Sequence, residues 1–350
     1  MKKNNYSAML AGIMLFIFLF VFSEKFIQGI NVGLLNCAKI VIPSLFPFLI
    51  ASSLSGSGKL PKTLKKLLEP LSQFLFRLPA ESLPCIFLGQ TGGYLSGAKA
   101  AQTLYSNGLL SKSQANRMLI FCINAGMGFS INAVGNAMLC SREAGRVLLA
   151  ALCISSLVTG VFISRVFPDS PKEKGKKAVQ NNTPFSSAVV NSVSSASQAM
   201  LTACAFVALF SGIGAVTDEY IKNDSLRLAV SCLLEVTKVC ADAAGKVSLP
   251  ALASICAFGG LCVHMQIFSI AQSLELKIVW FYGCRLLHSA LAYAVCKIIL
   301  YFHPVEMQVF LSFSENAEVF SFSAPAAISL LFLCILLILD LDNNPKMCYT

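Results

Sequence analysis

Apolar residues run along almost the whole chain in long segments that short polar stretches separate. Several of these segments have about 20 residues, the length at which an α-helix crosses a lipid bilayer. The uninterrupted ones predict membrane helices over residues 8–22, 147–166, 189–216, 278–301 and 324–339. The pattern therefore predicts an all-α polytopic membrane protein, and the chain is long enough for roughly eight to ten membrane segments.

The first apolar segment follows Lys2 and Lys3 and so has the basic start of a signal peptide. A signal peptide would end in a cleavage site of small residues, but Ser23-Glu24-Lys25 follows here, and further apolar segments come after it. We therefore expect an uncleaved transmembrane helix within residues 1–25.

Other apolar segments contain residues that disturb a helix. Pro43 and Pro47 each remove a backbone donor from the segment 27–54, which predicts a kinked or partly unwound helix. Glycines interrupt three further segments, at residues 83–105, 117–139 and 249–270. These segments predict glycine-broken helices or re-entrant hairpins.

A basic segment over residues 59–77 has a different pattern. Its leucines recur at helical spacing, opposite Lys62, Lys65 and Lys66. The segment is too polar to cross the bilayer. We expect an amphipathic helix that lies in the membrane interface, bent at Pro70.

An internal repeat is visible in the residues themselves. Three pairs of short sequences match in order, at an offset near 166 residues: Leu67-Leu68-Glu69 with Leu233-Leu234-Glu235, Leu83-Pro84 with Leu249-Pro250, and Gly92-Gly93 with Gly259-Gly260. They divide the chain into an N-terminal helix (1–25), a first repeat (26–167), a basic cytoplasmic linker (168–186), a second repeat (187–302), and a C-terminal loop with a final transmembrane helix (303–350).

The distribution of basic residues predicts how the repeats are oriented. Lysines and arginines gather at the N-terminus, in residues 59–77 and in the linker, and the positive-inside rule places all three on the cytoplasmic side. The leading helices of the two repeats then cross the membrane in opposite directions. Inverted repeats with broken helices are typical of secondary transporters, whose site lies near the membrane midplane between the repeats.

Composition excludes a soluble protein. The chain is 56% apolar and only 13% charged, whereas a soluble domain has about 25% charged residues. The net charge of +10 would suggest a nucleic-acid partner in a soluble protein. Here the basic residues lie between the spans, so we expect no nucleic-acid partner. The 14 cysteines form no CxxC pair and lie mostly in apolar segments, so they predict neither disulfides nor a zinc site.

Motifs of enzymes are missing from the sequence. There is no HExxH, no GxSxG, no Walker loop, and no GxGxxG after a strand. We therefore expect that the protein is not an enzyme, with no catalytic residues, no cofactor and no metal. The expected partners are the lipid bilayer and a small anionic substrate, and a homo-oligomer is left open.

Charged and polar residues inside apolar segments are the candidates for function, because a charge at the bilayer centre costs roughly 2.5–3.5 kcal/mol. We assign nine of them to substrate binding: Tyr94, Ser96, Lys99, Asn124, Thr237, Lys238, His264, Gln266 and Arg285. Glu235 is the candidate for coupling to a proton or a sodium ion.

Each candidate in the first repeat has a plainer alternative. Beside Lys99, glycines free the backbone to expose amide donors next to a cation, which suits an anionic or carbonyl-bearing substrate. Equally, Lys99 could extend from the end of a short helix toward water. Asn124 could bind substrate or join two helices.

The second repeat leaves similar alternatives open. Glu235 and Lys238 are three residues apart, so a local ion pair competes with a coupling role. Arg285 could pair with a substrate carboxylate, with Glu235 or with Asp242.

A series of motifs between about Ile40 and Ile299 resembles a known family: Pro43-Ser-Leu-Phe-Pro-Phe48, Gly93-Tyr-Leu-Ser-Gly-Ala-Lys99, Asn124-Ala-Gly126 with Ala133-Val-Gly135, Leu234-Glu-Val-Thr237, and Phe258-Gly-Gly-Leu-Cys-Val-His-Met-Gln266. The chain resembles the YlbJ (SpoVV) family of sporulation integral membrane proteins, which carry nucleoside-recognition (Gate) domains. It departs from that family in having Leu95 and Met127 where the family has prolines.

The resemblance implies a multi-pass protein of the cell membrane in endospore-forming bacteria, located in the mother-cell-derived outer forespore membrane. It implies that each repeat is Gate-like. It also implies a role in moving dipicolinic acid toward the forespore, with nucleoside or nucleobase transport and a non-transporting sporulation scaffold as alternatives. Dipicolinate is a small planar dianion, which Lys99, Lys238 and Arg285 could hold.

Overall fold

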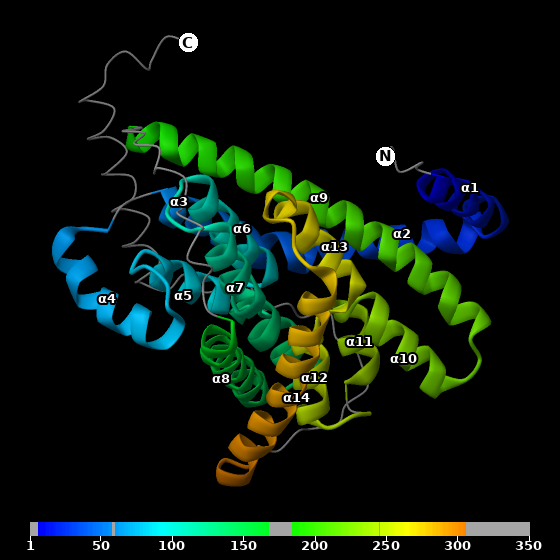
Figure 1. Cartoon of the computed structure of the whole chain (residues 1–350). Helices are drawn as coiled ribbons and strands as arrows, with labels where there is room; N and C mark the ends of the chain where they lie inside the picture. The colour runs from blue at the N-terminus through cyan, green and yellow to red at the C-terminus, as the bar shows by residue number, and fades with distance from the viewer. Residues whose placement is uncertain (1–5, 58–59, 168–183, 245, 306–350) are drawn as a thin grey trace.

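The computed structural model describes residues 6–57, 60–167, 184–244 and 246–305 (Figure 1). Every regular element in these residues is a helix, and no strand occurs among them. The all-α fold predicted from the apolar pattern is therefore confirmed. The predicted last helix, 324–339, and most of the predicted linker lie outside the described residues.

Helices long and apolar enough to cross a membrane number five in the described residues: Ser23–Gly56, Arg142–Val166, Phe185–Tyr220, Leu249–Ile270 and Ile278–Phe302. The N-terminal helix α1 (Tyr6–Val21) is shorter. The chain is a multi-pass membrane protein, as the sequence predicts.

The surface of helix α8 (Arg142–Val166) has the polarity expected of a membrane helix. Its large apolar side chains Val158 and Phe162 are about half exposed (47% and 51%). On the opposite face, Ser156 and Thr159 are fully buried. A soluble protein would show the reverse order. Apolar residues face outward here because lipid is as apolar as they are, and small polar residues pack and hydrogen-bond between helices.

The first long helix stays continuous through its two prolines. It consists of α2 (Ser23–Asn36), a π-helical turn η1 (Cys37–Val41) and α3 (Ile42–Ser57). The π-turn ends just before Pro43, which cannot donate to the helix ladder. The disturbance predicted from the prolines is therefore a local widening of the helix rather than an unwound stretch.

Helices α2 and α9 (Phe185–Tyr220) lie side by side over much of their length (Figure 1). Glycines allow this close approach. A Cβ built on Gly29 would lie 2.5 Å from the carbonyl oxygen of Ser211, and one on Gly33 would lie 2.8 Å from the Ser211 Cβ. Small residues in contact let two membrane helices approach backbone to backbone.

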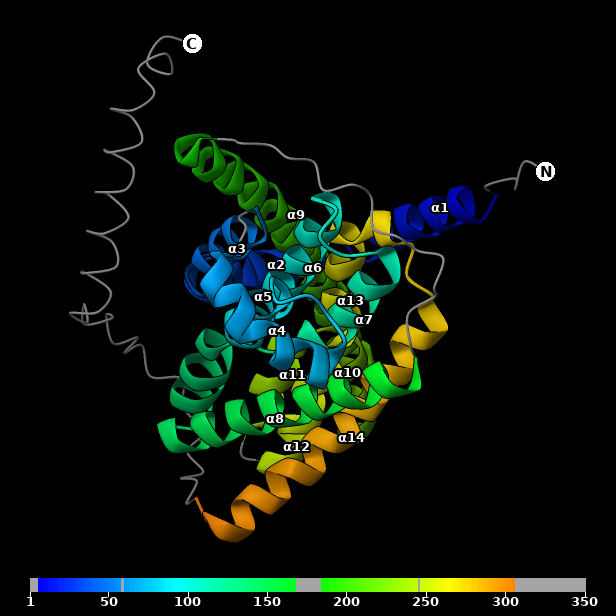
Figure 2. The same cartoon turned by 60° about the vertical axis from the view of Figure 1, so that its left-hand side comes forward.

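Helix α4 (Lys62–Phe76) is the predicted amphipathic helix, and it lies at the left-hand edge of the molecule in Figure 1 and at the front in Figure 2. Leu67 and Phe74 are more than two-thirds exposed (72% and 71%), which leaves an apolar face outward. Lys65 donates a 2.7 Å hydrogen bond to Glu81, and this contact raises the pKa of Lys65. Its place in the membrane interface stays a prediction.

Four broken helix pairs and two unbroken helices, together with a short 3-10 turn, complete the described fold. The first half contains α5 (Ser82–Gly92), α6 (Tyr94–Ser106), α7 (Lys112–Cys122), the π-helix η2 (Gly128–Met138) and α8. The second half, after α9, contains α10 (Asp224–Leu234), α11 (Val236–Ala243), α12 (Leu249–Phe258), α13 (Gly260–Ile270), η3 (Gln272–Leu274) and α14 (Ile278–Phe302).

The starts of helices recur between the two halves near the offset found in the sequence. Helix α6 begins at Tyr94 and α13 at Gly260, while α7 begins at Lys112 and α14 at Ile278. The halves differ in where they break. The second half has a break at Glu235, and α14 is continuous where α7 and η2 are separate. The opposite orientation of the halves stays a prediction.

Candidate functional site

Glycines form two of the four helix breaks. Helices α5 and α6 are separated at Gly93 (φ 104°), and α12 and α13 at Gly259 (φ 91°) and Gly260 (φ 76°). These angles lie in the left-handed region, where a side chain is strained and glycine is not. The predicted breaks are therefore present at both matched positions.

The four breaks pack in two pairs, one in each half of the chain. A Cβ on Gly126, in the break between α7 and η2, would lie 2.6 Å from the backbone nitrogen of Gly93. A Cβ on Gly260 would lie 3.3 Å from the carbonyl oxygen of Leu234, the residue before Glu235. We call residues 93–94, 123–126 and 257–260 together with Glu235 the break cluster. It joins backbone segments from both halves of the chain.

Arg285, from α14, is fully buried in the break cluster. Its Nη1 donates to the carbonyl of Ile123 (2.8 Å), its Nε to that of Phe258 (3.3 Å), and its Nη2 to that of Ala257. These carbonyls lie at the C-terminal ends of α7 and α12, which carry partial negative charge. The ion pair with Glu235 or Asp242 that the sequence allowed is absent from the described contacts.

Glu235 caps helix α11 instead of pairing with a lysine. Its buried carboxylate accepts hydrogen bonds from the backbone N–H groups of Thr237 (2.9 Å) and Lys238 (2.6 Å). Acceptors at this position stabilise a helix start, where the first N–H groups lack partners. The break at Glu235 therefore forms around the protein's own anion.

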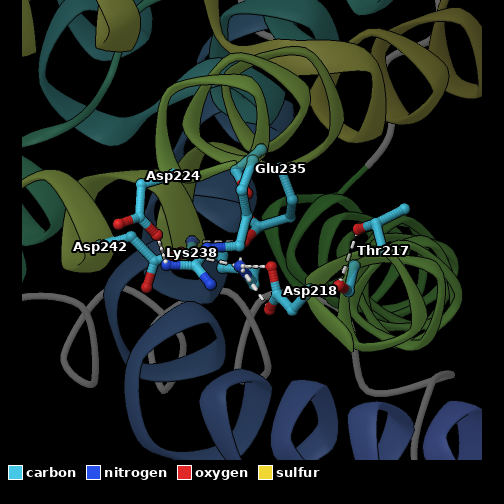
Figure 3. A network of polar contacts seen from close by, with 9 residues as sticks. Thr217, Asp218, Asp224, Glu235, Lys238 and Asp242 are labelled. Carbon is cyan, nitrogen blue, oxygen red and sulfur yellow. Dashed lines mark hydrogen bonds and ion pairs between the residues drawn. The ribbon is translucent and has the colours of Figure 1, made fainter. Parts of the chain in front are cut away.

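Lys238 lies between the carboxylates of Asp218 and Asp242 (Figure 3). Its Nζ lies 2.9 Å from a carboxylate oxygen of Asp218 on α9 and 2.7 Å from one of Asp242. The local ion pair expected between Glu235 and Lys238 is therefore replaced by two other carboxylates. A cavity of about 360 Å³ lies beside this network, lined by Asp218, Asp224, Ser225, Arg227, Leu228, Asp242 and Lys246.

His264 lies at the cluster and shares an acceptor with Arg285. Its Nε2 is 2.8 Å from the carbonyl oxygen of Phe258, and its ring packs edge-on against Phe281 and Tyr282. His288, which the site assignment omitted, is also buried, with its Nε2 3.4 Å from the carbonyl oxygen of Leu152 on α8.

Asn124 belongs to a buried amide network that holds the α7–η2 break. Its Nδ2 donates to Gln90 Oε1 (2.9 Å), and Gln90 Nε2 donates to the carbonyl of Phe121 (2.9 Å) and to Ser156 Oγ (2.8 Å). These bonds join helices, which is one of the two roles that the sequence allowed for Asn124. Sequence reasoning missed Gln90, although a polar amide beside Gly89 in an apolar segment was a usable signal.

Three assigned residues point to other neighbours. Lys99 Nζ donates to Ser195 Oγ on α9, and it contacts no carboxylate among the described residues. Ser96 Oγ lies 2.6 Å from Ser52 Oγ on α3. Gln266 Nε2 donates to Cys262 Sγ within α13 (3.2 Å). Half-buried Lys99 is thus a cation with only a hydroxyl partner in the described part of the chain.

The side chain of Tyr94, the first residue of α6, reaches the glycines that separate α12 from α13. The N-cap residue of each helix is a glycine, and in the described part of the chain no side chain is hydrogen-bonded to the first N–H groups of α6 or α13. A Cβ on Gly259 would lie 3.5 Å from Tyr94 Cε1, and Tyr94 Oη donates to the carbonyl of Cys256 (2.7 Å). Two positive helix ends, one from each half, therefore lie in the break cluster, with Glu235 beside the start of α13. Chemically, such ends attract anions.

No group of three or more His, Cys, Asp or Glu side chains that could hold a metal ion occurs in the residues that the structure covers. The described side chains at the break cluster thus offer hydrogen-bond donors, a buried cation and one buried carboxylate. This arrangement can bind and orient a small polar molecule.

Comparison with known proteins gives one similar curated protein, the sporulation integral membrane protein YlbJ of Bacillus subtilis (strain 168). The two sequences are 27% identical over 134 residues, which are 38% of this chain and 33% of YlbJ. The match thus spans a third of the relative's length. No family model and no solved structure matches the chain. The similarity confirms the resemblance to sporulation integral membrane proteins that the sequence motifs indicate.

Proposed function

We propose that this protein is a secondary transporter of a small organic anion, and that the anion binds at the break cluster. One observation carries the proposal: α6 and α13 both begin at buried glycine breaks that the side chain of Tyr94 connects, and no side chain of the described residues caps either helix start. Each helix N-terminus carries about half a positive charge. Transporters bind anionic groups at such half-helix ends near the membrane midplane.

Dipicolinate, moved during endospore formation, is the substrate that we propose. The molecule has two carboxylates on one small planar ring, and the cluster offers two helix N-termini, one from each half. Arg285 adds a buried cation beside them. The similarity to YlbJ, whose name describes a sporulation integral membrane protein, supports the setting and the proposed place in the outer forespore membrane.

Vesicle transport tests the substrate. The full chain is reconstituted into liposomes, and uptake of labelled dipicolinate and labelled uridine is measured against empty liposomes. We expect saturable dipicolinate uptake and no uridine uptake. Uptake of uridine alone would replace the proposal with a nucleoside carrier.

The dipicolinate content of spores tests the biological role. We expect spores of a strain that lacks this protein to contain much less dipicolinate than spores of the parent, and a plasmid copy to restore the content. Normal dipicolinate content in the mutant spores would remove the proposed role. A low content that is restored by a variant unable to move dipicolinate in vesicles would point to a scaffold.

A further inference from the structure

Arg285 connects the two halves of the protein across the break cluster. It belongs to α14 in the second half and donates both to Ile123, at the end of α7 in the first half, and to residues 257–258 at the end of α12. Three separate helices are thus held at one guanidinium. The side chain is fully buried, so water does not share its donors.

The acceptors of this guanidinium are uncharged carbonyls. Among the described contacts, no carboxylate bonds to Arg285. A carboxylate is a stronger acceptor, because hydrogen bonds between charged partners are roughly twice as strong as neutral ones. An anion that comes within reach therefore competes with the carbonyls for the same N–H groups.

The place where the proposed anion binds is within that reach. A Cβ on Gly259 would lie 3.7 Å from Arg285 Nη2 and 3.5 Å from Tyr94 Cε1. The guanidinium and the side chain of Tyr94, the first residue of α6, thus meet at the glycine that precedes α13.

The C-terminal ends of α7 and α12, whose carbonyls accept from Arg285, would respond differently to such competition. When Arg285 leaves, the carbonyl of Ala257 loses this donor. The carbonyl oxygen of Phe258 keeps His264 Nε2 at 2.8 Å, and α12 stays bonded to α14 because Ser289 Oγ donates to the carbonyl of Ser254 (2.8 Å). For the carbonyl oxygen of Ile123, Arg285 is the one donor in the described contacts. Loss of Arg285 therefore removes the hydrogen bond between the end of α7 and the second half, while α12 stays bonded to α14.

We infer that Arg285 is an anion-released clamp: it ties α7 to α12 while the site is empty, and a bound carboxylate takes its donors and releases α7. This inference rests on the proposed function. It supplies the step that a transporter needs, in which substrate binding changes how one half of the chain contacts the other.

Hydrogen–deuterium exchange of the full chain in lipid nanodiscs tests the clamp first without ligand. In Arg285→Gln we expect exchange at residues 118–127 to rise about tenfold or more, because hydrogen bonds from a charged group are lost. Arg285→Lys keeps the charge but has no fork to reach both helix ends, so a smaller rise is expected. Arg227→Gln, at an exposed arginine paired with Asp224, is the matched control. An unchanged rate in both Arg285 variants overturns the clamp.

The second arm adds dipicolinate to the wild-type protein. We expect faster exchange at residues 118–127 and no increase at 252–258. Slower or unchanged exchange at 118–127, in protein that takes up dipicolinate in vesicles, overturns the release while the transport function stands. Absence of dipicolinate uptake overturns the proposed function and the release with it, and the ligand-free arm still decides whether Arg285 ties α7 to α12.

Discussion

The phenol of Tyr94 donates a 2.7 Å hydrogen bond to the carbonyl oxygen of Cys256. Tyr94 is the first residue of α6, and Cys256 lies in the last turn of α12. The two residues thus flank matched breaks in the two halves of the chain. Together with Arg285, this bond holds the halves against each other at the break cluster.

Replacing Tyr94 by phenylalanine should weaken this contact and leave the ring in place. A buried carbonyl without its donor costs about 1–3 kcal/mol, so we expect Tyr94→Phe to lower the Tm of the detergent-purified protein by several degrees. Tyr301→Phe is the control, because Tyr301 is 81% exposed. Equal Tm values for the two variants would show that the Tyr94 bond contributes nothing.

Paired glycines in the sequence predicted two of the helix breaks that form the site. The pairs Gly92-Gly93 and Gly259-Gly260, set in apolar segments, predicted two breaks, and the structure has them there. The partners of Arg285 were beyond sequence reasoning, because backbone carbonyls exist at every residue and carry no signature. An arginine in an apolar segment suggests a carboxylate partner, yet helix C-terminal ends serve instead.

The contact between breaks predicts a sharp difference between two glycines. A Cβ on Gly126 would lie 2.6 Å from the nitrogen of Gly93 and 2.7 Å from the oxygen of Thr91, both backbone atoms that cannot turn aside. We expect Gly126→Ala to cost about 1–3 kcal/mol or to prevent folding. Gly283→Ala on α14 meets nothing within 4 Å and should be neutral or slightly stabilising. Thermal unfolding of both variants decides, and similar Tm values would contradict the close contact of the breaks.

Lys238 shows where local spacing misleads. The sequence places Glu235 one helical turn from Lys238, which favours a pair between them. A separate helix brings Asp218 to the same ammonium, and Glu235 turns to the backbone N–H groups at the start of α11. The break at Glu235 has no glycine or proline to announce it, so the sequence did not predict it. Contacts between helices far apart in the sequence determine both the partners of Lys238 and the position of this break.

Lys99 should matter for anion transport and little for stability. It is half-buried and bonds only to Ser195 among the described residues, so its charge remains available to an anion that enters beside α6. We expect Lys99→Gln to raise the KM for dipicolinate roughly tenfold, with Tm unchanged within a few degrees. Lys112→Gln is the matched control, because Lys112 pairs with Glu275 at 2.6 Å. An unchanged KM for Lys99→Gln would exclude a binding role for this lysine.

Glu235 could act as a helix cap alone or also as a coupling group, and the variant Glu235→Gln tests both roles. Its carboxylate receives two backbone N–H groups, and glutamine offers one oxygen and turns an NH2 group toward the other donor. We expect Glu235→Gln to lose about 1 kcal/mol of stability from the weaker cap.

A coupling role predicts a further loss that a cap does not. Uptake by Glu235→Gln should then no longer respond to an imposed proton or sodium gradient, while exchange of dipicolinate across vesicles at equal concentrations persists. Glu24→Gln, at an exposed glutamate on α2, should keep the gradient response. A gradient response that survives in Glu235→Gln, together with a lowered Tm, would leave Glu235 as the cap of α11 and place the coupling ion elsewhere.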